Sequence, residues 1–151
     1  VTKGASKWLS LHRYRQEGGD NTRSCITKLK SDGYHIVATS PHATEIGIGE
    51  LDLSKKIALV FGNEAEGISQ SSAAMADSFV TVPMLGFTES FNISVAAAIC
   101  LYEVRSRLEK ECANWRLSDE ELATLEIEWM KKSIRNSEGI IKNYYGQASG
   151  N

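Results

Sequence analysis

This 151-residue chain has two short loops whose side chains could take part in catalysis or ligand binding, judged by their types and spacing. The first loop reads Gly62-Asn63-Glu64-Ala65-Glu66-Gly67-Ile68-Ser69. Its glycine spacing imitates a phosphate-binding loop, but the lysine after the second glycine is absent and the two carboxylates would repel a triphosphate. The dinucleotide pattern Gly-x-Gly-x-x-Gly is absent too. Two interpretations stay open: a tight turn in which backbone approaches a ligand, or a strand-to-helix turn whose acids lie near a helix N-terminus.

The second loop precedes a long apolar segment and reads Leu85-Gly86-Phe87-Thr88-Glu89-Ser90-Phe91-Asn92. Ser90, Asn92 and Ser94 gather where a helix is expected to begin. Ser and Asn are the usual N-capping residues, so ordinary capping explains part of the pattern. The alternative is a polar pocket in which the N-terminus of the helix faces a substrate.

The elements that position these loops alternate along the chain. Short apolar runs predict strands over residues 34–38, 57–61 and 79–84, with Pro83 marking the end of the third. Helices are predicted over residues 23–32, ended by Gly33, over 69–76, capped by Ser69 or a residue near it, and over 93–112. This order indicates an α/β domain with a mostly parallel sheet flanked by helices. Both loops then follow strands, at the carboxyl edge where such sheets bind ligands.

The helix over residues 93–112 is apolar on all sides through Ala98, which predicts a buried helix with Cys100 as a small buried hydrophobe. The tail opens with a Ser-x-x-Glu capping box at Ser118 and Glu121. One further helix is expected after it, continuing past Ile134 to Ile141.

The composition excludes several classes of protein. Apolar residues make up 42% and charged residues 24%, which rules out a disordered tail, a collagen-like repeat and a coiled coil. No apolar run reaches the roughly 18 residues of a membrane span.

Three cysteines and three histidines share no metal-ligand spacing, so no zinc site is expected. The odd number of cysteines favours a reduced, intracellular compartment. Residues 1–30 carry a local charge of +5, which suits a polyanionic partner or simply a solvated surface.

Taken together, the loops resemble the second and third motifs of the SpoU/TrmH family of RNA ribose 2′-O-methyltransferases, in the SPOUT superfamily. The matching residues are the Asn-Glu-x-x-Gly loop from Asn63 to Gly67 and the helix start Ser90-Phe91-Asn92-Ile93-Ser94-Val95-Ala96. Lys3-Gly4-Ala5-Ser6-Lys7-Trp8 is similar to the family's segment leading into a strand. The resemblance covers residues 1–110, and the tail is similar to the C-terminal helix of the tRNA guanosine-18 branch.

The resemblance implies a C-terminal trefoil knot, exceptional among folds, and S-adenosyl-L-methionine held bent within it. By position, the cofactor-binding residues are Thr39, Gly62, Val82, Leu85 and Phe91. Glu64, Ser90 and Asn92 match the polar active-site positions that orient the nucleophile, with no base assigned among them. The resemblance also implies a homodimer with residues 93–112 at its interface, although an intramolecular core role suits the same helix. No metal is implied.

One part of the family pattern is missing from this sequence. The first motif, an Asn followed by an Arg and a Gly, should precede Lys3, and Arg13, Arg15 and Arg23 do not occupy its place. We therefore expect either that the parent protein continues upstream of Val1 or that the chain binds without turnover. The predicted domains are a SPOUT methyltransferase domain over 1–112, lacking its N-terminal strand, and a helical extension over 113–151.

The sequence thus predicts S-adenosylmethionine-dependent 2′-O-methylation of a ribose in RNA, with a tRNA guanosine as the expected target. A ribosomal RNA methyltransferase and a non-catalytic RNA-binding or dimerisation remnant of the same fold are the alternatives. A third alternative is a generic nucleotide-binding α/β domain, which would require the match to the two family motifs to be a coincidence. The expected location is cytoplasmic, and an organellar one stays open because a transit peptide would lie upstream of Val1.

Overall fold

The computed structural model describes residues 4, 8–41, 46–87, 90–111 and 115–148. These residues form two compact units. One comprises the described residues of 13–115, and the other comprises those of 1–12 and 116–148. The third cysteine of the sequence, Cys112, lies outside the described residues. We describe each unit by itself.

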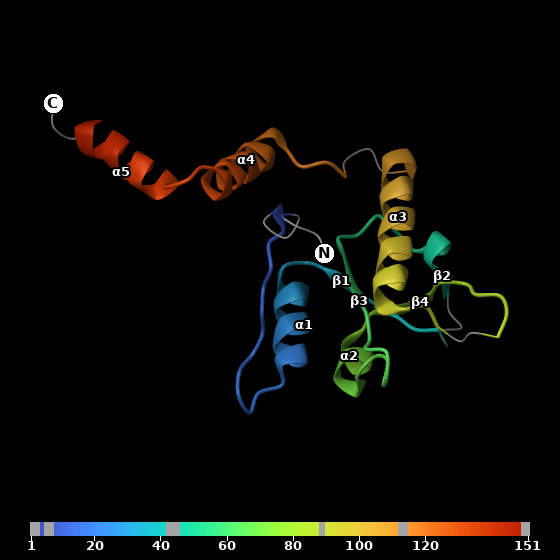
Figure 1. Ribbon diagram of the computed structural model, residues 1–151. Coiled ribbons are helices and arrows are strands. Elements are labelled where there is room, and N and C mark those ends of the chain that lie inside the picture. The colour runs from blue at the N-terminus through green and yellow to red at the C-terminus, as the bar shows by residue number, and fades with distance from the viewer. Residues whose placement is uncertain (1–3, 5–7, 42–45, 88–89, 112–114, 149–151) are drawn as a thin grey trace. The chain divides into compact units, whose positions relative to one another are not determined.

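The first unit is built on a four-stranded sheet in the order β2-β4-β1-β3, and every pair is parallel (Figure 1). The strands are β1 (His35–Thr39), β2 (Ile46–Gly47), β3 (Ile57–Val60) and β4 (Ser78–Thr81). The predicted α/β class and parallel sheet are therefore confirmed. Because β1 lies between β3 and β4, the segments that follow these three strands leave the sheet side by side.

The strands differ from the sequence prediction in two places. The pattern predicted three strands, and the sheet has a fourth, β2, which is only two residues long and pairs with Val80 and Thr81. Strand β4 also ends at Thr81 instead of continuing to residue 84. Pro83 has no N–H to donate to a ladder, which explains why pairing stops before it.

The two faces of the sheet are covered by different helices. Val37 and Val80 are fully buried and belong to one cluster with Cys100 of α3 (Ile93–Glu111). Side chains alternate along a strand, so Ile36 and Ala38 point to the opposite face, where α1 (Asn21–Ser31) and α2 (Gln70–Met75) contact β1. The prediction that Cys100 is a buried hydrophobe is confirmed, and burial raises the pKa of its thiol.

The predicted helices are present, with small shifts at their ends. Helix α1 starts two residues earlier than predicted because Asp20 caps it, accepting a hydrogen bond from the backbone N–H of Arg23 at 2.9 Å. This bond is the main cause of a lowered pKa for Asp20. Gly33 follows with φ of +80°, a conformation that ends helices. Ser69 caps α2 as predicted.

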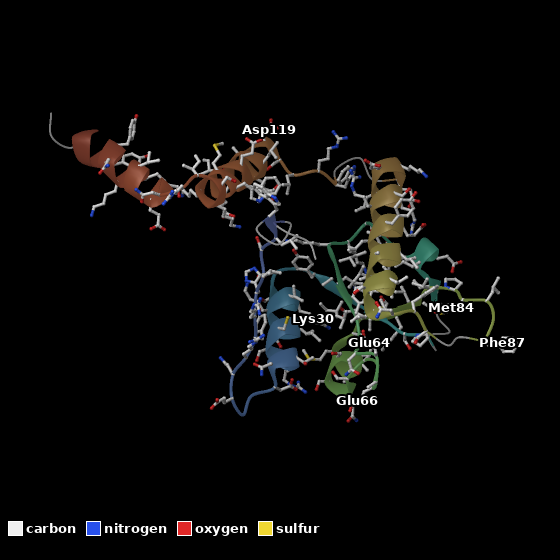
Figure 2. The ribbon with its side chains drawn as sticks, in the orientation of Figure 1. Lys30, Glu64, Glu66, Met84, Phe87 and Asp119 are labelled. Atoms are coloured by element: carbon white, nitrogen blue, oxygen red, sulfur yellow. The ribbon has the colours of Figure 1, made fainter. Side chains whose placement is uncertain are left out.

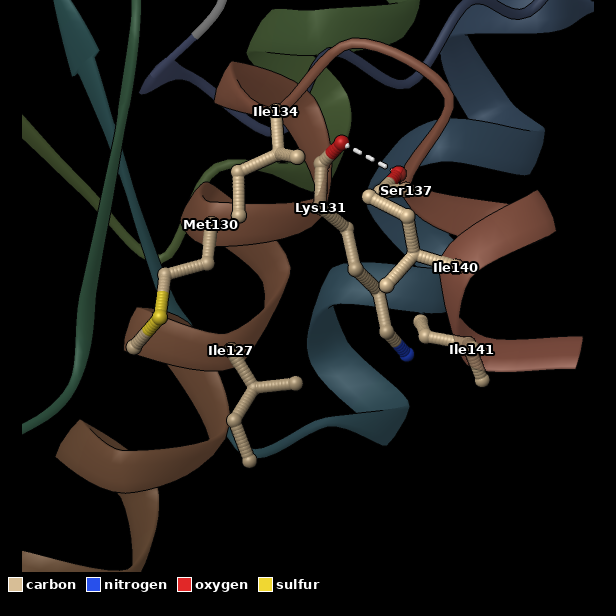
Figure 3. A pocket seen from close by; sticks show the side chains of 7 residues that line it. All are labelled: Ile127, Met130, Lys131, Ile134, Ser137, Ile140 and Ile141. Carbon is tan, nitrogen blue, oxygen red and sulfur yellow. Dashed lines mark hydrogen bonds between the residues drawn. The ribbon is translucent and has the colours of Figure 1, made fainter. Parts of the chain in front are cut away.

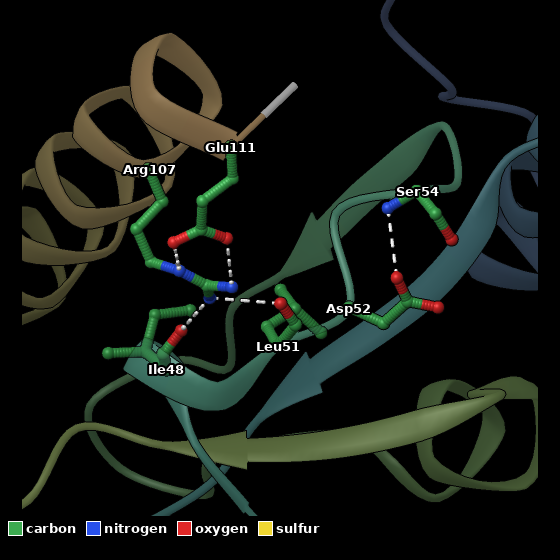
Figure 4. A network of polar contacts seen from close by, with 6 residues as sticks. All are labelled: Ile48, Leu51, Asp52, Ser54, Arg107 and Glu111. Atoms are coloured by element: carbon green, nitrogen blue, oxygen red, sulfur yellow. Dashed lines mark hydrogen bonds and ion pairs between the residues drawn. The ribbon is translucent and has the colours of Figure 1, made fainter. Parts of the chain in front are cut away.

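One arginine ties helix α3 to the 3₁₀ turn η2 (Ile48–Glu50) that precedes β3 (Figure 4). The guanidinium of Arg107 donates to the backbone oxygen of Leu51 at 2.9 Å and of Ile48 at 3.4 Å. It also donates to both carboxylate oxygens of Glu111, which lowers the pKa of that carboxyl. The five N–H donors of a guanidinium allow this double attachment.

Helix α3 is not buried on all sides within one chain. Val95, Leu101 and Tyr102 are exposed by 46%, 60% and 75%. The apolar face opposite the sheet therefore has no covering from the described residues of its own unit. The sequence prediction of a fully buried helix is wrong for the isolated chain.

The second unit contains α4 (Asp119–Ser133) and α5 (Ser137–Ala148). The capping box at Ser118 and Glu121 is confirmed. The prediction of a single helix beyond it is wrong. The helix is interrupted at Ile134, where the backbone is extended, and at Asn136, where φ is +59°. Trp8 packs edge-to-face against Trp129 of α4, with 5.3 Å between ring centroids. Within the described ranges, no helix of either unit is both long and apolar enough to cross a membrane.

Candidate functional site

A cavity of about 560 Å³ lies where β1, β3 and β4 end. The segment after β1 supplies Thr39 to Pro41, and the segment after β3 forms one wall from Phe61 to Ile68. The segment after β4 and the first turn of α3 close the opposite side. The carboxyl edge of a parallel sheet is the usual ligand site of such folds, and the volume suits a small organic ligand.

The acidic loop over residues 62–67 is closed on itself by backbone bonds. Asn63 N–H donates to the Gly67 oxygen at 3.0 Å, and Gly67 N–H donates back to the Asn63 oxygen at 2.9 Å. The side-chain oxygen of Asn63 also accepts the N–H groups of Ala65 and Glu66, at 2.9 and 2.7 Å. The loop is therefore a preorganised turn that presents its backbone beside the cavity.

Both glycines of this loop are required by its geometry. A Cβ on Gly62 would overlap the backbone of Gly67, because the two chain segments meet there. Gly67 itself has φ of +68°, which L side chains rarely adopt. The loop connects β3 to α2 and also lies beside the cavity, so the structure agrees with both interpretations left open by the sequence, and approach of this backbone to a ligand stays a prediction.

Six of the eight residues predicted for the site line this single cavity. Thr39, Gly62, Val82 and Phe91 were expected to bind the cofactor, and Glu64 and Ser90 to act on the substrate. The hydroxyl of Thr39 donates to the Val60 backbone oxygen at 3.1 Å, which joins the ends of β1 and β3. The structure brings these residues together from the ends of β1, β3 and β4 and the segments that follow them, and their chemical roles stay predictions.

The other two predicted residues do not line the cavity. Leu85 lies on the loop after β4 and is fully exposed. Asn92 is exposed too, and its side-chain oxygen accepts the backbone N–H of Ser94 at 3.0 Å, which is a capping interaction at the start of α3. Asn92 thus has the capping role that was one of its two interpretations.

The cavity also has lining residues that were not among the eight predicted site residues. They are Ser40, Pro41, Phe61, Asn63, Ala65, Glu66, Gly67, Ile68, Ala73, Phe79, Met84, Ile93 and Ala96. Most are apolar, and nothing in their local pattern separates them from core residues. Asn63 is different, since an Asn directly before an acidic turn is a signal for a side chain that bonds its own backbone.

Two of the polar side chains that line the cavity, Glu64 and Glu66, carry negative charge. Both lie on the loop after β3 and are exposed, and Figure 2 labels their side chains. Neither carboxylate has an ion-pair partner among the described residues. Their field disfavours a polyphosphate and favours a ligand with a cationic group, while Phe61, Phe79 and Phe91 offer apolar surface for a flat ring.

A second hollow, within the helical unit, has a different character (Figure 3). It lies between α4 and α5 and is lined by Ile127, Met130, Lys131, Ile134, Ser137, Ile140 and Ile141. The Ser137 hydroxyl is engaged with the Lys131 backbone oxygen at 2.8 Å, so the hollow offers few polar groups for chemistry. In the part of the chain that the structure describes, no three His, Cys, Asp or Glu side chains are placed to share a metal ion.

The fold and the cavity define a parallel α/β protein with a ligand-sized cavity at the ends of its strands. Residues 1–102 match the family model described as the SpoU rRNA Methylase family. The chain is 39% identical over 140 residues to the tRNA (guanosine(18)-2'-O)-methyltransferase of Borreliella burgdorferi, covering 93% of this chain and 62% of that relative. This protein belongs to the SpoU methylase family, as its motifs predicted.

Solved structures give the same result. The A. aeolicus TrmH/SpoU tRNA modifying enzyme matches with a TM-score of 0.63 and 33% identity, over 78% of this chain and 61% of that one. The AdoMet-bound rRNA methyltransferase of Sinorhizobium meliloti matches with a TM-score of 0.52 and 30% identity, over 58% of this chain and 33% of that one. The chain spans about three fifths of the length of the curated relative from Borreliella.

Proposed function

We propose that this chain forms the cofactor-binding part of an S-adenosylmethionine-dependent RNA ribose 2′-O-methyltransferase whose substrate is a tRNA guanosine. The observation that carries the proposal is the single cavity at the strand ends, which collects six residues expected from the family motifs. Relatives named for methylation of tRNA guanosine-18 support the choice of tRNA.

The residues of the cavity fit this cofactor. S-adenosylmethionine carries a positively charged sulfonium and an ammonium, which suit the carboxylates of Glu64 and Glu66 where a polyphosphate would not. Aromatic and aliphatic side chains such as Phe61 and Phe91 suit its adenine. Gly62 and the closed turn behind it leave backbone groups accessible to the ligand.

When bound, S-adenosylmethionine supplies an electrophilic methyl group. The contribution of this chain is then to place a ribose 2′-hydroxyl in line with that group. Ser90 and Glu64 line the cavity and have no hydrogen-bond partner within the described residues, so both are available to orient the hydroxyl. Asn92 supports the same segment by capping α3.

The proposal also covers the domain boundaries, the knot, the oligomeric state and the location of the protein. We assign residues 1–112 to the methyltransferase domain and 113–151 to a helical extension, with the trefoil knot of the superfamily formed around the cavity. The enzyme acts as a homodimer, and the exposed apolar residues Val95, Leu101 and Tyr102 of α3 belong to its interface. The proposed location is cytoplasmic, where tRNA is modified in bacteria.

The test is transfer of a labelled methyl group from S-adenosylmethionine to unmodified tRNA and to ribosomal RNA fragments. The 151-residue chain is assayed beside the protein from its complete coding region. We expect label on a single tRNA guanosine 2′-oxygen with the complete protein, and loss of transfer with Ser90→Ala at unchanged melting temperature. Label on ribosomal RNA alone would favour the alternative that the family description suggests. No transfer to either RNA would favour a non-catalytic remnant.

A further inference from the structure

The described cations of the basic region over residues 1–30 are of two kinds, those with and those without an acidic partner. The three cations of α1 each have an acidic partner within 4 Å. The pairs are Arg23 with Asp20, Lys28 with Asp32 and Lys30 with Asp77. An ion-paired cation attracts a phosphate less strongly, because the carboxylate cancels most of its field.

Arg13 and Arg15 differ from these cations. Both are exposed, and neither has an ion pair or a hydrogen bond to any of the described residues. They flank Tyr14, which is exposed by 37% and has no ring contact within the described part of the chain. We call residues 13–15 the basic tract.

The end of the basic tract is held in place beside α1. The Asn21 side chain accepts the N–H of Gln16 at 2.8 Å and donates to its backbone oxygen at 3.1 Å. Gly18, with φ of +73°, turns the chain between these two residues. The tract therefore leads into an anchored turn instead of a free end, which lowers the entropy lost when it binds.

We propose that the basic tract binds unpaired nucleotides of the RNA substrate. The ring of Tyr14 stacks on one exposed base, and Arg13 and Arg15 contact the flanking phosphates. Alternating cations and aromatic rings are how proteins bind single strands, and an exposed ring needs a base that is not already stacked in a helix. This inference rests on the proposed function, since RNA is the substrate there.

The experiment compares two variants with the same loss of charge. Arg13→Gln/Arg15→Gln removes the unpaired cations, and Arg23→Gln/Lys28→Gln removes two paired ones. Affinity for unmodified tRNA is measured by fluorescence anisotropy over a range of salt concentrations. We expect the tract variant to bind roughly tenfold more weakly, with a salt dependence reduced by about 1.5 in log–log slope, and the control to bind within about twofold of wild type.

Tyr14 gives a second, charge-neutral test. Tyr14→Ala removes the stacking ring and is expected to weaken binding of a single-stranded oligonucleotide by roughly fivefold or more, while Tyr14→Phe retains the ring and the affinity. A tract variant that binds RNA like its α1 control, or a Tyr14→Ala that binds like wild type, would overturn the inference. Titration with S-adenosylmethionine separates this failure from failure of the proposed function. If only the role of the basic tract is wrong, wild type and every variant still bind S-adenosylmethionine. If the proposed function is wrong, wild type itself does not bind S-adenosylmethionine.

Discussion

At the scale of single residues, the cavity depends on side chains that shape the backbone more than on side chains that face the ligand. Asn63 is the clearest example, since its side-chain oxygen accepts two N–H groups of its own loop. These bonds keep Gly62 close to Gly67 and hold Glu64 and Glu66 beside the cavity. The motif predicted the acids and glycines; the position of Asn63 before the turn signals a bond to its own backbone, and the structure shows which N–H groups it accepts.

Asn63→Ala is expected to weaken S-adenosylmethionine binding by roughly tenfold. It removes two hydrogen bonds worth about 1 kcal/mol each, part of which water restores at this exposed position. Asn63→Asp keeps the acceptor and should bind within about threefold of wild type. Asp52→Ala is the matched control, because Asp52 makes the same kind of bond to Ser54 N–H outside the cavity. Equal affinity for Asn63→Ala and wild type by calorimetry would contradict this role.

At the scale of elements, the sequence predicted what local pattern determines and missed what distant contacts determine. Strands β1 and β3 were predicted within a residue or two because each is a continuous apolar run. Strand β2 has only Ile46 and Gly47, so its pairing depends on β4, more than 30 residues further along the chain. The break at Asn136 escaped prediction because the apolar period continues through it and no Gly or Pro marks it.

The carboxylate of Asp77 joins three elements at the amino edge of the sheet. It accepts a bond from Lys30 Nζ of α1 at 2.6 Å and from the Ile36 N–H of β1 at 2.8 Å, directly before β4 begins. The Lys30 bond is the main cause of a lowered pKa for Asp77, and the Ile36 bond adds to it. The ionised form is therefore favoured by folding.

Because its folded-state pKa is lowered, Asp77 contributes stability that is complete above its unfolded-state pKa of about 4 and is lost as the pH falls through the folded-state value. The free energy of unfolding of wild type should therefore decrease more steeply below roughly pH 5 than that of Asp77→Asn. Other acids are common to both proteins and cancel in the comparison. Urea denaturation across this pH range is the measurement, and parallel curves would show that Asp77 contributes nothing. The effect is modest, since a third of the side chain is exposed.

At the scale of the whole molecule, the order of the strands creates the site. Residues 39, 62 and 82 are about 20 residues apart, and they meet because β1 lies between β3 and β4. Composition and periodicity predicted a parallel sheet but not this order. The resemblance to a known family predicted which loops converge, and the cavity agrees for six of the eight residues. The exposed apolar face of α3 is not covered by any of the described residues.

The proposed homodimer predicts a clear effect of charge on that face. Tyr102→Glu places a carboxylate on a residue exposed by 75% in the single chain and should convert a dimer into monomers, because burying an unpaired charge is costly. Tyr144→Glu, at a similarly exposed tyrosine of α5, should leave the dimer intact. Sedimentation velocity at several concentrations measures both. A monomeric wild type, or a dimeric Tyr102→Glu, would contradict the assignment of α3 to the interface.

The central claim is that the cavity at the ends of β1, β3 and β4 binds S-adenosylmethionine. Isothermal titration of the 151-residue chain with this cofactor tests it most directly, with Gly62→Ala as the variant and Gly49→Ala as the control. A Cβ on Gly62 meets backbone, whereas one on Gly49 makes only ordinary contact with the Glu103 carboxylate. Melting curves confirm that each variant is folded before titration. We predict one-to-one binding by wild type and Gly49→Ala and a loss of at least tenfold in Gly62→Ala. Absence of binding by wild type, or equal binding by a folded Gly62→Ala, would contradict the account.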